Sequence, residues 1–287
     1  MKLGRIGARG HEKPALFHSD GTWRDLSGAI ADITPQTLTP AGLKALAQLD
    51  VSKLPVLPAG RIGVPWSGCG KFVCVGLNYA DHAAEAGMPI PAEPVLFTKH
   101  VCTMVGCNDG VVLPLGSVKT DWEVELGIVI GSQARYVSEA DALKHVAGYC
   151  VVNDVSEREY QLERGGTWDK GKGCDTFGPV GPWMVSADEV PDPQALAMWL
   201  DVNGHRYQNG NTRTMVFNVA QLVSYISRFT TLFPGDLIST GTPPGVGMGV
   251  KPQSVFLKPG DQMHVGIQGL GEQHQSVYAW DPARIDG

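Results

Sequence analysis

The sequence has little charge of either sign, no long apolar run and no paired-cysteine motif. Charged residues make up 18% of the 287 residues, the net charge is -6, and no run of like charges occurs. We therefore expect neither nucleic acid nor an anionic membrane as a partner. No apolar segment approaches the roughly 20 residues of a membrane helix, and the first residues, MKLGRIGARG, lack the apolar centre of a secretory signal. These absences predict a cytoplasmic protein.

The cysteines and the turn-forming residues narrow the fold class. None of the six cysteines forms a Cys-x-x-Cys pair, which argues against zinc ribbons and thioredoxin-type redox motifs. The 36 glycines and 20 prolines indicate many turns between short strands. We therefore expect reduced thiols in a β-rich α+β fold.

The chain divides into two parts by its pattern of strands and turns. Residues 3–6 and 14–18 are strand candidates, and Thr39-Pro40 opens a candidate helix. The passage from Leu54 to Gly70 is rich in proline and glycine and is typical of a connection. The pattern predicts a small N-terminal α/β module over 1–68 and a larger domain over 69–287.

An acidic strand, DWEVELGIVIG, begins at Asp121. Alternate side chains of a strand point to opposite faces, so Glu123 and Glu125 share one face. Such a pair either faces water or binds a metal ion. The apolar run from Gly127 to Gly131 favours a strand that is buried on both faces, and buried carboxylates need a cationic partner. A later apolar run ends at Asp154, where a third carboxylate is able to approach this pair.

Two further groups are candidates for chemistry. His82 and Glu85 are three residues apart just after the strand 71–77, a spacing that on a helix suits a carboxylate-oriented general base or, equally, a surface ion pair. The segment 87–94 is a candidate lid. Lys99 ends another strand, where a surface position is the simpler interpretation, and Lys172 lies in a glycine-rich loop where it is able to approach a ligand.

Seven segments together resemble the fumarylacetoacetate hydrolase superfamily. They cover the chain from about Lys71 to its end and stand in the order of the family. These segments are GLNYADHAAE, EPVLFTKH, DWEVELGIVIG, GYCVVNDVSERE, KGCDTFGPVGP, NTRTMVF and GDLISTGTPPGVG. The resemblance implies a mixed β-roll or barrel catalytic domain that forms a homodimer.

The same resemblance implies the site residues. It assigns the metal ligands to Glu123, Glu125 and Asp154, a set of oxygen ligands that suits Mg²⁺ first, with Mn²⁺ or Ca²⁺ as alternatives. It places Lys172 beside the metal. It also implies a base dyad of His82 and Glu85, and pocket positions at Lys99 and Thr242 that hold an acidic group of the substrate.

Within this superfamily the chain is most similar to bacterial 2,4-diketo-3-deoxy-L-fuconate or -rhamnonate hydrolases. The implied reaction is hydrolytic cleavage of a C–C bond in a 2,4-diketo acid, which yields pyruvate and a small hydroxy acid. Leu77 stands where acylpyruvate-hydrolysing and oxaloacetate-decarboxylating relatives often carry arginine, which favours a neutral substrate tail. The alternatives are an oxaloacetate decarboxylase or acylpyruvate hydrolase, a 2-hydroxymuconate-type isomerase and, more remotely, a non-catalytic ligand-binding protein.

Overall fold

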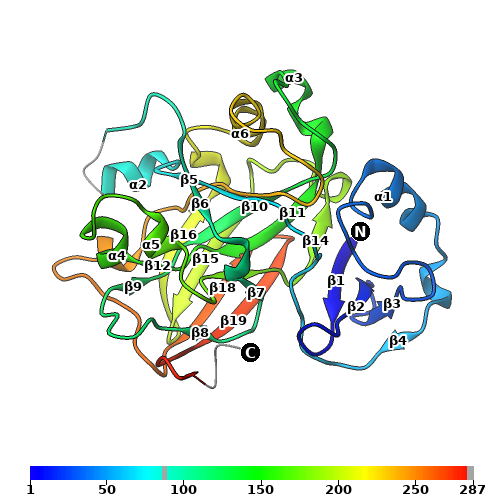
Figure 1. Ribbon diagram of the computed structural model, residues 1–287, viewed down its shortest axis with the longest axis horizontal. Helices are drawn as coiled ribbons and strands as arrows, with labels where there is room; N and C mark the ends of the chain where they lie inside the picture. Colours follow the sequence, from blue (N-terminus) through cyan, green and yellow to red (C-terminus); the bar gives the residue numbers. More distant parts are fainter. Residues whose placement is uncertain (86–88, 283–287) are drawn as a thin grey trace.

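The computed structural model describes residues 1–85 and 89–282, with the backbone alone described at 82–84 (Figure 1). Its α-helices are α1 (Pro40–Ala47), α2 (Ala80–Glu85), α3 (Glu139–Ala142), α4 (Arg158–Leu162), α5 (Asp169–Lys172) and α6 (Val219–Ile226). Its strands are β1 (Lys2–Ile6), β2 (Lys13–Phe17), β3 (Trp23–Asp25), β4 (Val56–Leu57), β5 (Phe72–Gly76), β6 (Val95–Lys99), β7 (Met104–Gly106), β8 (Val111–Val112), β9 (Thr120–Asp121), β10 (Val124–Ile130), β11 (Val146–Asn153), β12 (Ser156–Glu157), β13 (Gly178–Val180), β14 (Met184–Ser186), β15 (Ala197–Val202), β16 (His205–Asn211), β17 (Leu237–Ser239), β18 (Gln262–Ile267) and β19 (Gly271–Tyr278). The expected β-rich α+β fold is confirmed.

Most strands belong to one mixed sheet of 12 strands. Its main path runs β4-β3-β2-β1-β14-β11-β10-β17-β5-β6, while β13 and β7 branch from β11. The path ends at β4 on one side and at β6 on the other, so the sheet stays open. The barrel that the resemblance allowed as an alternative to a roll is therefore not formed by the described strands.

The centre of this sheet is the antiparallel pair β10 and β11, which is buried along its whole length. Val124 pairs with Asn153, and the register continues to Val129 and Gly148 before an irregularity at Ile130. Alternate residues of the pair enter two different apolar cores, one on each face of the sheet. Burial on both faces explains why these strands read as nearly continuous apolar runs.

A second sheet of five strands, in the order β16-β15-β18-β19-β8, packs on one face of the central pair. The two sheets are joined by hydrogen bonds as well as by apolar contacts. Asn153 at the end of β11 donates through Nδ2 to Oε1 of Gln275 on β19, at 3.2 Å. The other face of the five-stranded sheet carries polar and exposed residues, as the alternating burial of β19 indicates.

The N-terminal module is an extension of the main sheet (Figure 1). Strand β1 pairs with β14, where Leu3 stands opposite Met184, and the core beneath the module runs on into the central strands. Helix α1 begins after the N-cap Thr39, whose side chain accepts from the backbone N–H of Gly42. The strands and the helix expected here are confirmed, whereas the division at residue 68 stays a prediction.

Several elements around the centre differ in detail from their sequence patterns. The glycine-rich segment 165–179, expected as a loop, contains the short helix α5. The sequence pattern predicts this strand from Tyr149, but β11 starts at Val146, which pairs with Ile130, and Gly148 pairs with Ser186 of β14 in the buried centre. Such pairing depends on distant strands and leaves no local signal.

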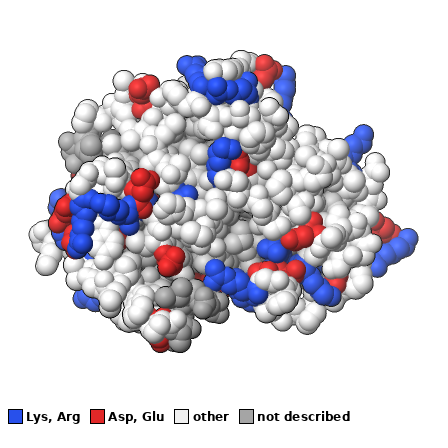
Figure 2. Space-filling model, viewed as in Figure 1, with Lys and Arg blue, Asp and Glu red and all other residues white. Residues whose placement is uncertain are grey.

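The surface carries no dominant charge on the face seen in Figure 2. Basic and acidic side chains lie in small mixed groups that are separated by wide uncharged areas (Figure 2). Among residues 1–85 and 89–282, no helix combines the length and the apolar character that crossing a membrane requires.

Candidate metal centre and active-site cavity

Three buried carboxylates meet at one end of the central strand pair. Glu123 immediately precedes β10, Glu125 lies on it, and Asp154 follows β11. The exposed fractions of these residues are 6%, 2% and 0%. One carboxylate oxygen from each lies within 4.8 Å of the others. The Asp154 N–H donates to the backbone oxygen of Glu123 at 2.9 Å, so the backbone pairing itself brings the three together, as the sequence predicted.

Glu123 is held by two cations. Its Oε1 accepts from the Arg158 guanidinium and its Oε2 from Nζ of Lys172, both at 2.7 Å. Burial opposes ionisation of this carboxyl group, but the charges of Lys172 and Arg158 outweigh it and lower the pKa of Glu123 to about 2. Arg158 also donates to Asp121 at 2.8 Å. Glu123 is therefore a carboxylate with a fixed orientation.

Asp154 lies between two lysines. Lys172 donates to its Oδ2 at 2.8 Å and Lys99 to its Oδ1 at 2.7 Å. Lys99 also donates to the backbone oxygen of Val155 and is 2% exposed. The structure thus places Lys99 behind Asp154, in contact with this carboxylate, and not among the described residues that line the neighbouring cavity.

Lys172 is a cation that the carboxylates around it stabilise. Burial opposes its charge, but the carboxylates of Asp154 and Glu123 outweigh burial and raise its pKa above the ordinary value for lysine. A lysine that stays protonated is a poor base and a poor nucleophile. Its ammonium group instead offers hydrogen bonds and positive charge at the mouth of the carboxylate cluster, where it lines the cavity.

Glu125 differs from the other two carboxylates because no described basic side chain forms a salt bridge with it. Its Oε2 accepts from the Ser239 hydroxyl at 2.5 Å and from the Gly241 N–H at 2.9 Å. Burial, followed by the neighbouring charges of Asp154 and Glu123, raises the pKa of Glu125 well above its ordinary value. A divalent cation among the three carboxylates would reverse this shift, because it favours the ionised form.

The residues present therefore fit a bound cation. Asp121, Glu123, Glu125 and Asp154 bring four carboxylates, whereas Lys99, Arg158 and Lys172 bring three buried positive charges. The three carboxylates of the centre are oxygen ligands, which suit a hard ion such as Mg²⁺, Mn²⁺ or Ca²⁺. Three protein ligands would leave coordination positions for water and substrate.

A cavity of about 170 Å³ opens beside these carboxylates. Its polar wall comes from Glu123, Glu125, Arg158, Gln161, Lys172 and Thr242. Its apolar wall comes from Val75, Leu77, Phe97, Leu162, Trp168 and Met248. Leu77 has a φ of 54°, which is uncommon for a residue with a side chain and is often found where function constrains the backbone.

Thr242 lines this cavity, but its hydroxyl is already engaged. It donates to the backbone oxygen of Val124 at 2.9 Å and accepts from Nε2 of Gln208 at 2.7 Å. Gln208 also accepts from the Val124 N–H. These bonds hold the segment that contains Thr242 against the start of β10. Thr242 is thus a wall residue whose hydroxyl has one remaining lone pair for a donor.

The helix that carries the sequence-predicted base is α2. The backbone of His82 lies within it, but the His82 side chain is outside the described residues, as are the first two residues, 87 and 88, of the predicted lid. Glu85, at the end of α2, accepts from the N–H of Gly245 at 3.1 Å. The indole N–H of Trp122 donates to the backbone oxygen of Gly245. Helix α2 therefore contacts the loop that follows Thr242.

Sequence reasoning missed Arg158, Asp121 and Gln161. Arg158 and Gln161 lie on α4, in a segment that its composition marks only as a charged helix, yet both are 4% exposed and 3.0 Å apart between Nη1 and Oε1. The one signal for Arg158 in the sequence is a count of charges. Three buried carboxylates that cluster with a single lysine imply that further cations lie nearby.

Known proteins share this architecture. The model of the fumarylacetoacetate hydrolase C-terminal domain matches residues 71–278. A protein of Burkholderia multivorans, whose name states a hydrolase and no substrate, is 62% identical over 280 residues, which are 97% of this chain and 99% of that protein. A fumarylacetoacetate hydrolase from Exiguobacterium antarcticum is 33% identical with a TM-score of 0.86, over 98% of this chain and 100% of its own.

Two further solved structures differ in the activity that their names state. A 5-carboxymethyl-2-hydroxymuconate delta-isomerase from Mycobacterium smegmatis is 30% identical with a TM-score of 0.76. A maleylpyruvate hydrolase from Sphingobium sp. SYK-6, in complex with manganese (II) ion and pyruvate, is 28% identical with a TM-score of 0.82. Each comparison covers 98% of this chain and 100% of the other. The scaffold therefore serves hydrolases and isomerases, and the chain belongs to the fumarylacetoacetate hydrolase family.

Proposed function

We propose that this protein is a divalent-metal-dependent hydrolase that cleaves a C–C bond in a 2,4-diketo acid and releases pyruvate. The observation that carries the proposal is the buried set of Glu123, Glu125 and Asp154 with protonated Lys172 at the wall of a cavity. Support also comes from the manganese (II) ion and pyruvate named for the maleylpyruvate hydrolase.

The reaction takes up one water. The water oxygen bonds to the C4 carbonyl carbon, the bond between C3 and C4 breaks, and its electron pair goes to C3 as the enolate of pyruvate. C3 then takes a proton, so the products are pyruvate and the carboxylic acid that holds C4. A site for this reaction must activate water and stabilise negative charge on the pyruvate half.

Glu123, Glu125 and Asp154 would hold the cation, with Mg²⁺ as the first choice and Mn²⁺ or Ca²⁺ as alternatives. When bound, such a cation polarises the 2-oxo acid end and neutralises charge that develops there. Lys172 adds a positively charged donor, and one well-placed donor of this kind contributes about 3 to 4 kcal/mol to transition-state stabilisation.

His82, oriented by Glu85, is the proposed base that takes a proton from the attacking water. A neutral imidazole is suited to this role near pH 7, and the position of His82 just after the end of a strand is one where catalytic groups are often presented. The contact of Glu85 with Gly245 supports this assignment, because it ties α2 to the loop beside Thr242 on the cavity wall.

The substrate tail is proposed to be neutral. Leu77 supplies no charge to bind a second carboxylate, and the family resemblance favours 2,4-diketo-3-deoxy-L-fuconate or -rhamnonate. Gln161 and Thr242 are the uncharged polar side chains of the cavity wall, and Thr242 is the proposed contact for a hydroxyl donor. Lys99 would act through Asp154, which it orients from behind.

The apolar half of the cavity wall favours a second class of substrate, whose neutral tail is an alkyl chain. Leu77, Leu162, Trp168 and Met248 offer contact to an alkyl chain and no hydrogen bond to a polyol, apart from the indole N–H of Trp168. An acylpyruvate with a short alkyl tail is therefore the competing substrate class for the same reaction.

A substrate screen with controlled metal tests the proposal. We expect pyruvate release from a diketo-deoxy sugar acid or an acylpyruvate when Mg²⁺ or Mn²⁺ is present. Exhaustive chelation should abolish turnover and added metal should restore it, because three buried carboxylates without a cation repel one another. Turnover of oxaloacetate alone would contradict the proposal, and full activity after chelation would remove the metal from it.

Replacement of His82 separates hydrolysis from the other chemistry known on this scaffold, such as the isomerisation named for one neighbour. We expect His82→Ala to lower the rate of diketo acid hydrolysis about 10²- to 10⁴-fold, the usual contribution of a general base, while Mg²⁺ affinity changes little. The matched control is His205→Ala, an exposed histidine on β16. Unchanged hydrolysis by the His82 variant would assign the base elsewhere.

A further inference from the structure

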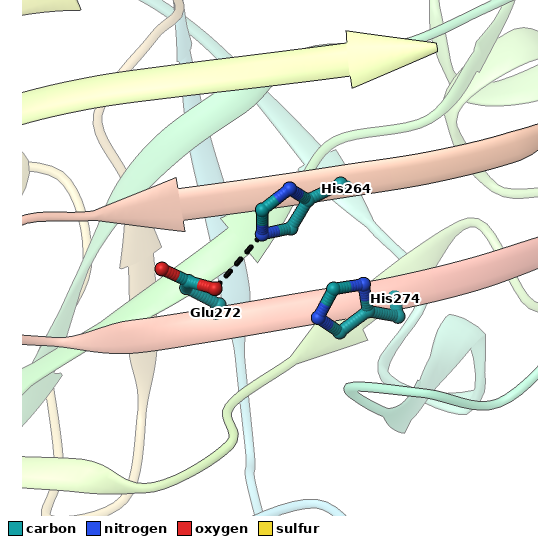
Figure 3. A group of neighbouring side chains, drawn as sticks. All are labelled: His264, Glu272 and His274. Atoms are coloured by element: carbon teal, nitrogen blue, oxygen red, sulfur yellow. Dashed lines mark hydrogen bonds and ion pairs between the residues drawn. The ribbon is translucent and has the colours of Figure 1, made fainter. Parts of the chain in front are cut away.

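A second cluster of metal-binding side chains lies on the five-stranded sheet, away from the carboxylate centre. His264 on β18 stands directly opposite His274 on β19, and Glu272 lies two residues before His274. All three point to the same face of the sheet (Figure 3). Their neighbours Met263, Val265, Gln273 and Gln275 are buried on the other face, as the alternation of a strand requires.

The three side chains are close and open to solvent. Nε2 of His264 lies 2.9 Å from Oε2 of Glu272, and the imidazole rings of His264 and His274 stack with centroids 4.4 Å apart. One ligand atom from each residue lies within 4.8 Å of the others. The exposed fractions of the His264 and Glu272 side chains are 34% and 50%, so an ion from solvent reaches them directly.

A carboxylate lies behind the ring of His264. Its Nδ1 lies 3.5 Å from Oδ2 of Asp201 on the neighbouring strand β15, where Asp201 pairs with His264 in the register. Arg206 donates to both oxygens of Asp201 and holds it in place. A carboxylate that binds one ring nitrogen leaves the other nitrogen as the ligand, which is the usual support for a histidine on a metal.

The ligand types select a different class of cation from the buried centre. Imidazole nitrogen binds Zn²⁺, Ni²⁺ and Cu²⁺ well and Mg²⁺ poorly, whereas three carboxylates favour the hard ions. Metal–nitrogen bonds of about 2.0–2.1 Å require both nitrogens to turn toward one point. The stacked rings must therefore rotate on binding, and their exposure leaves room for that rotation.

We propose that His264, His274 and Glu272 form a surface site for a transition-metal ion of the Zn²⁺, Ni²⁺ and Cu²⁺ class. Asp201 is a positioning residue of this site, and water completes the coordination. The ion links β18 to β19 across their outer face. Without it, the same residues form an ordinary hydrogen-bonded surface cluster, which is the alternative that the test must exclude.

Zn²⁺ binding by the full chain in excess Mg²⁺ tests the site, because Mg²⁺ occupies the carboxylate centre in preference to the histidines. Calorimetric titration of the wild-type protein should show one Zn²⁺ equivalent that His264→Ala and His274→Ala bind at least about tenfold more weakly. Glu272→Gln should weaken it less, because two imidazoles remain. His205→Ala, which changes an exposed histidine of the same sheet, should bind Zn²⁺ like the wild type.

Two readouts keep the result unambiguous. Zn²⁺ that enters the carboxylate centre would persist in the double variant with both histidines replaced, so the site is measured by the difference between that variant and the wild type. Hydrolytic activity in Mg²⁺ should be the same in both proteins, which shows that the variant is folded. The proposal is overturned if the two proteins take up equal Zn²⁺ with equal affinity, or if the wild type takes up none in excess Mg²⁺.

Discussion

Lys172→Met is expected to lower kcat about 10²- to 10³-fold while the affinity for Mg²⁺ increases. The loss of rate follows from the removal of a charged donor that stabilises the enolate. The gain in metal affinity follows because the ammonium group of Lys172 lies 2.7 Å from Glu123 and 2.8 Å from Asp154, where it repels a second cation. Measurement of kcat against Mg²⁺ concentration gives both quantities.

The matched control is Lys170→Met, two residues away on the same short helix. Lys170 is exposed and donates to the backbone oxygen of Arg164 at 2.8 Å, without contact to the carboxylates. This variant should keep wild-type kcat and Mg²⁺ dependence. If Lys172→Met regained full kcat once Mg²⁺ was saturating, Lys172 would be a counterion of the ligands without a role in the chemical step.

Arg158→Met is expected to lower the free energy of unfolding by about 3–5 kcal/mol, the usual cost of removing one partner of a buried ion pair. Arg158 is 4% exposed and bridges Asp121 and Glu123 at 2.8 and 2.7 Å. Methionine fills the space but leaves two buried carboxylates without this cation. Urea unfolding in the presence of a chelator measures the loss, and saturating Mg²⁺ should recover part of it through Glu123.

Arg164→Met supplies the comparison for this experiment. Arg164 lies just beyond α4 and pairs with Glu159 at 2.6 Å with a side chain that is 55% exposed. Its loss should cost no more than about 1 kcal/mol. Where Arg158→Met yields too little folded protein, Arg158→Lys keeps the charge and removes the forked geometry. Equal costs for positions 158 and 164 would refute the structural role of Arg158.

Much of the fold was predictable because its strands bear local signals. The apolar run after Glu125 predicts a strand that is buried on both faces, and Thr39-Pro40 predicts the start of α1. The structure confirms both. The early start of β11 and the helix α5 within a glycine-rich segment were not predictable. Both depend on pairing and packing with distant elements, which override local preference.

The candidate site divides in the same way. The carboxylates of Glu123 and Glu125 are visible in sequence because like charges on one face of a buried strand demand an explanation. Arg158 is invisible, since a basic residue on a short charged helix is normally solvated. The position of Lys99 at the end of a strand is predictable from the sequence. Its burial against Asp154 is not, because that contact forms only when β6 and the segment after β11 come together.

The pairing of Val124 with Asn153 has a consequence for which changes in length the protein tolerates. Backbone hydrogen bonds between β10 and β11 align the start of β10 with the end of β11. The register of this strand pair therefore fixes the positions of the carboxylates. Insertions in the connection over 131–145 leave that register unchanged. A single residue added to β10 between Glu125 and Val129 turns Glu125 to the opposite face of the sheet, which would dismantle the centre without altering any ligand.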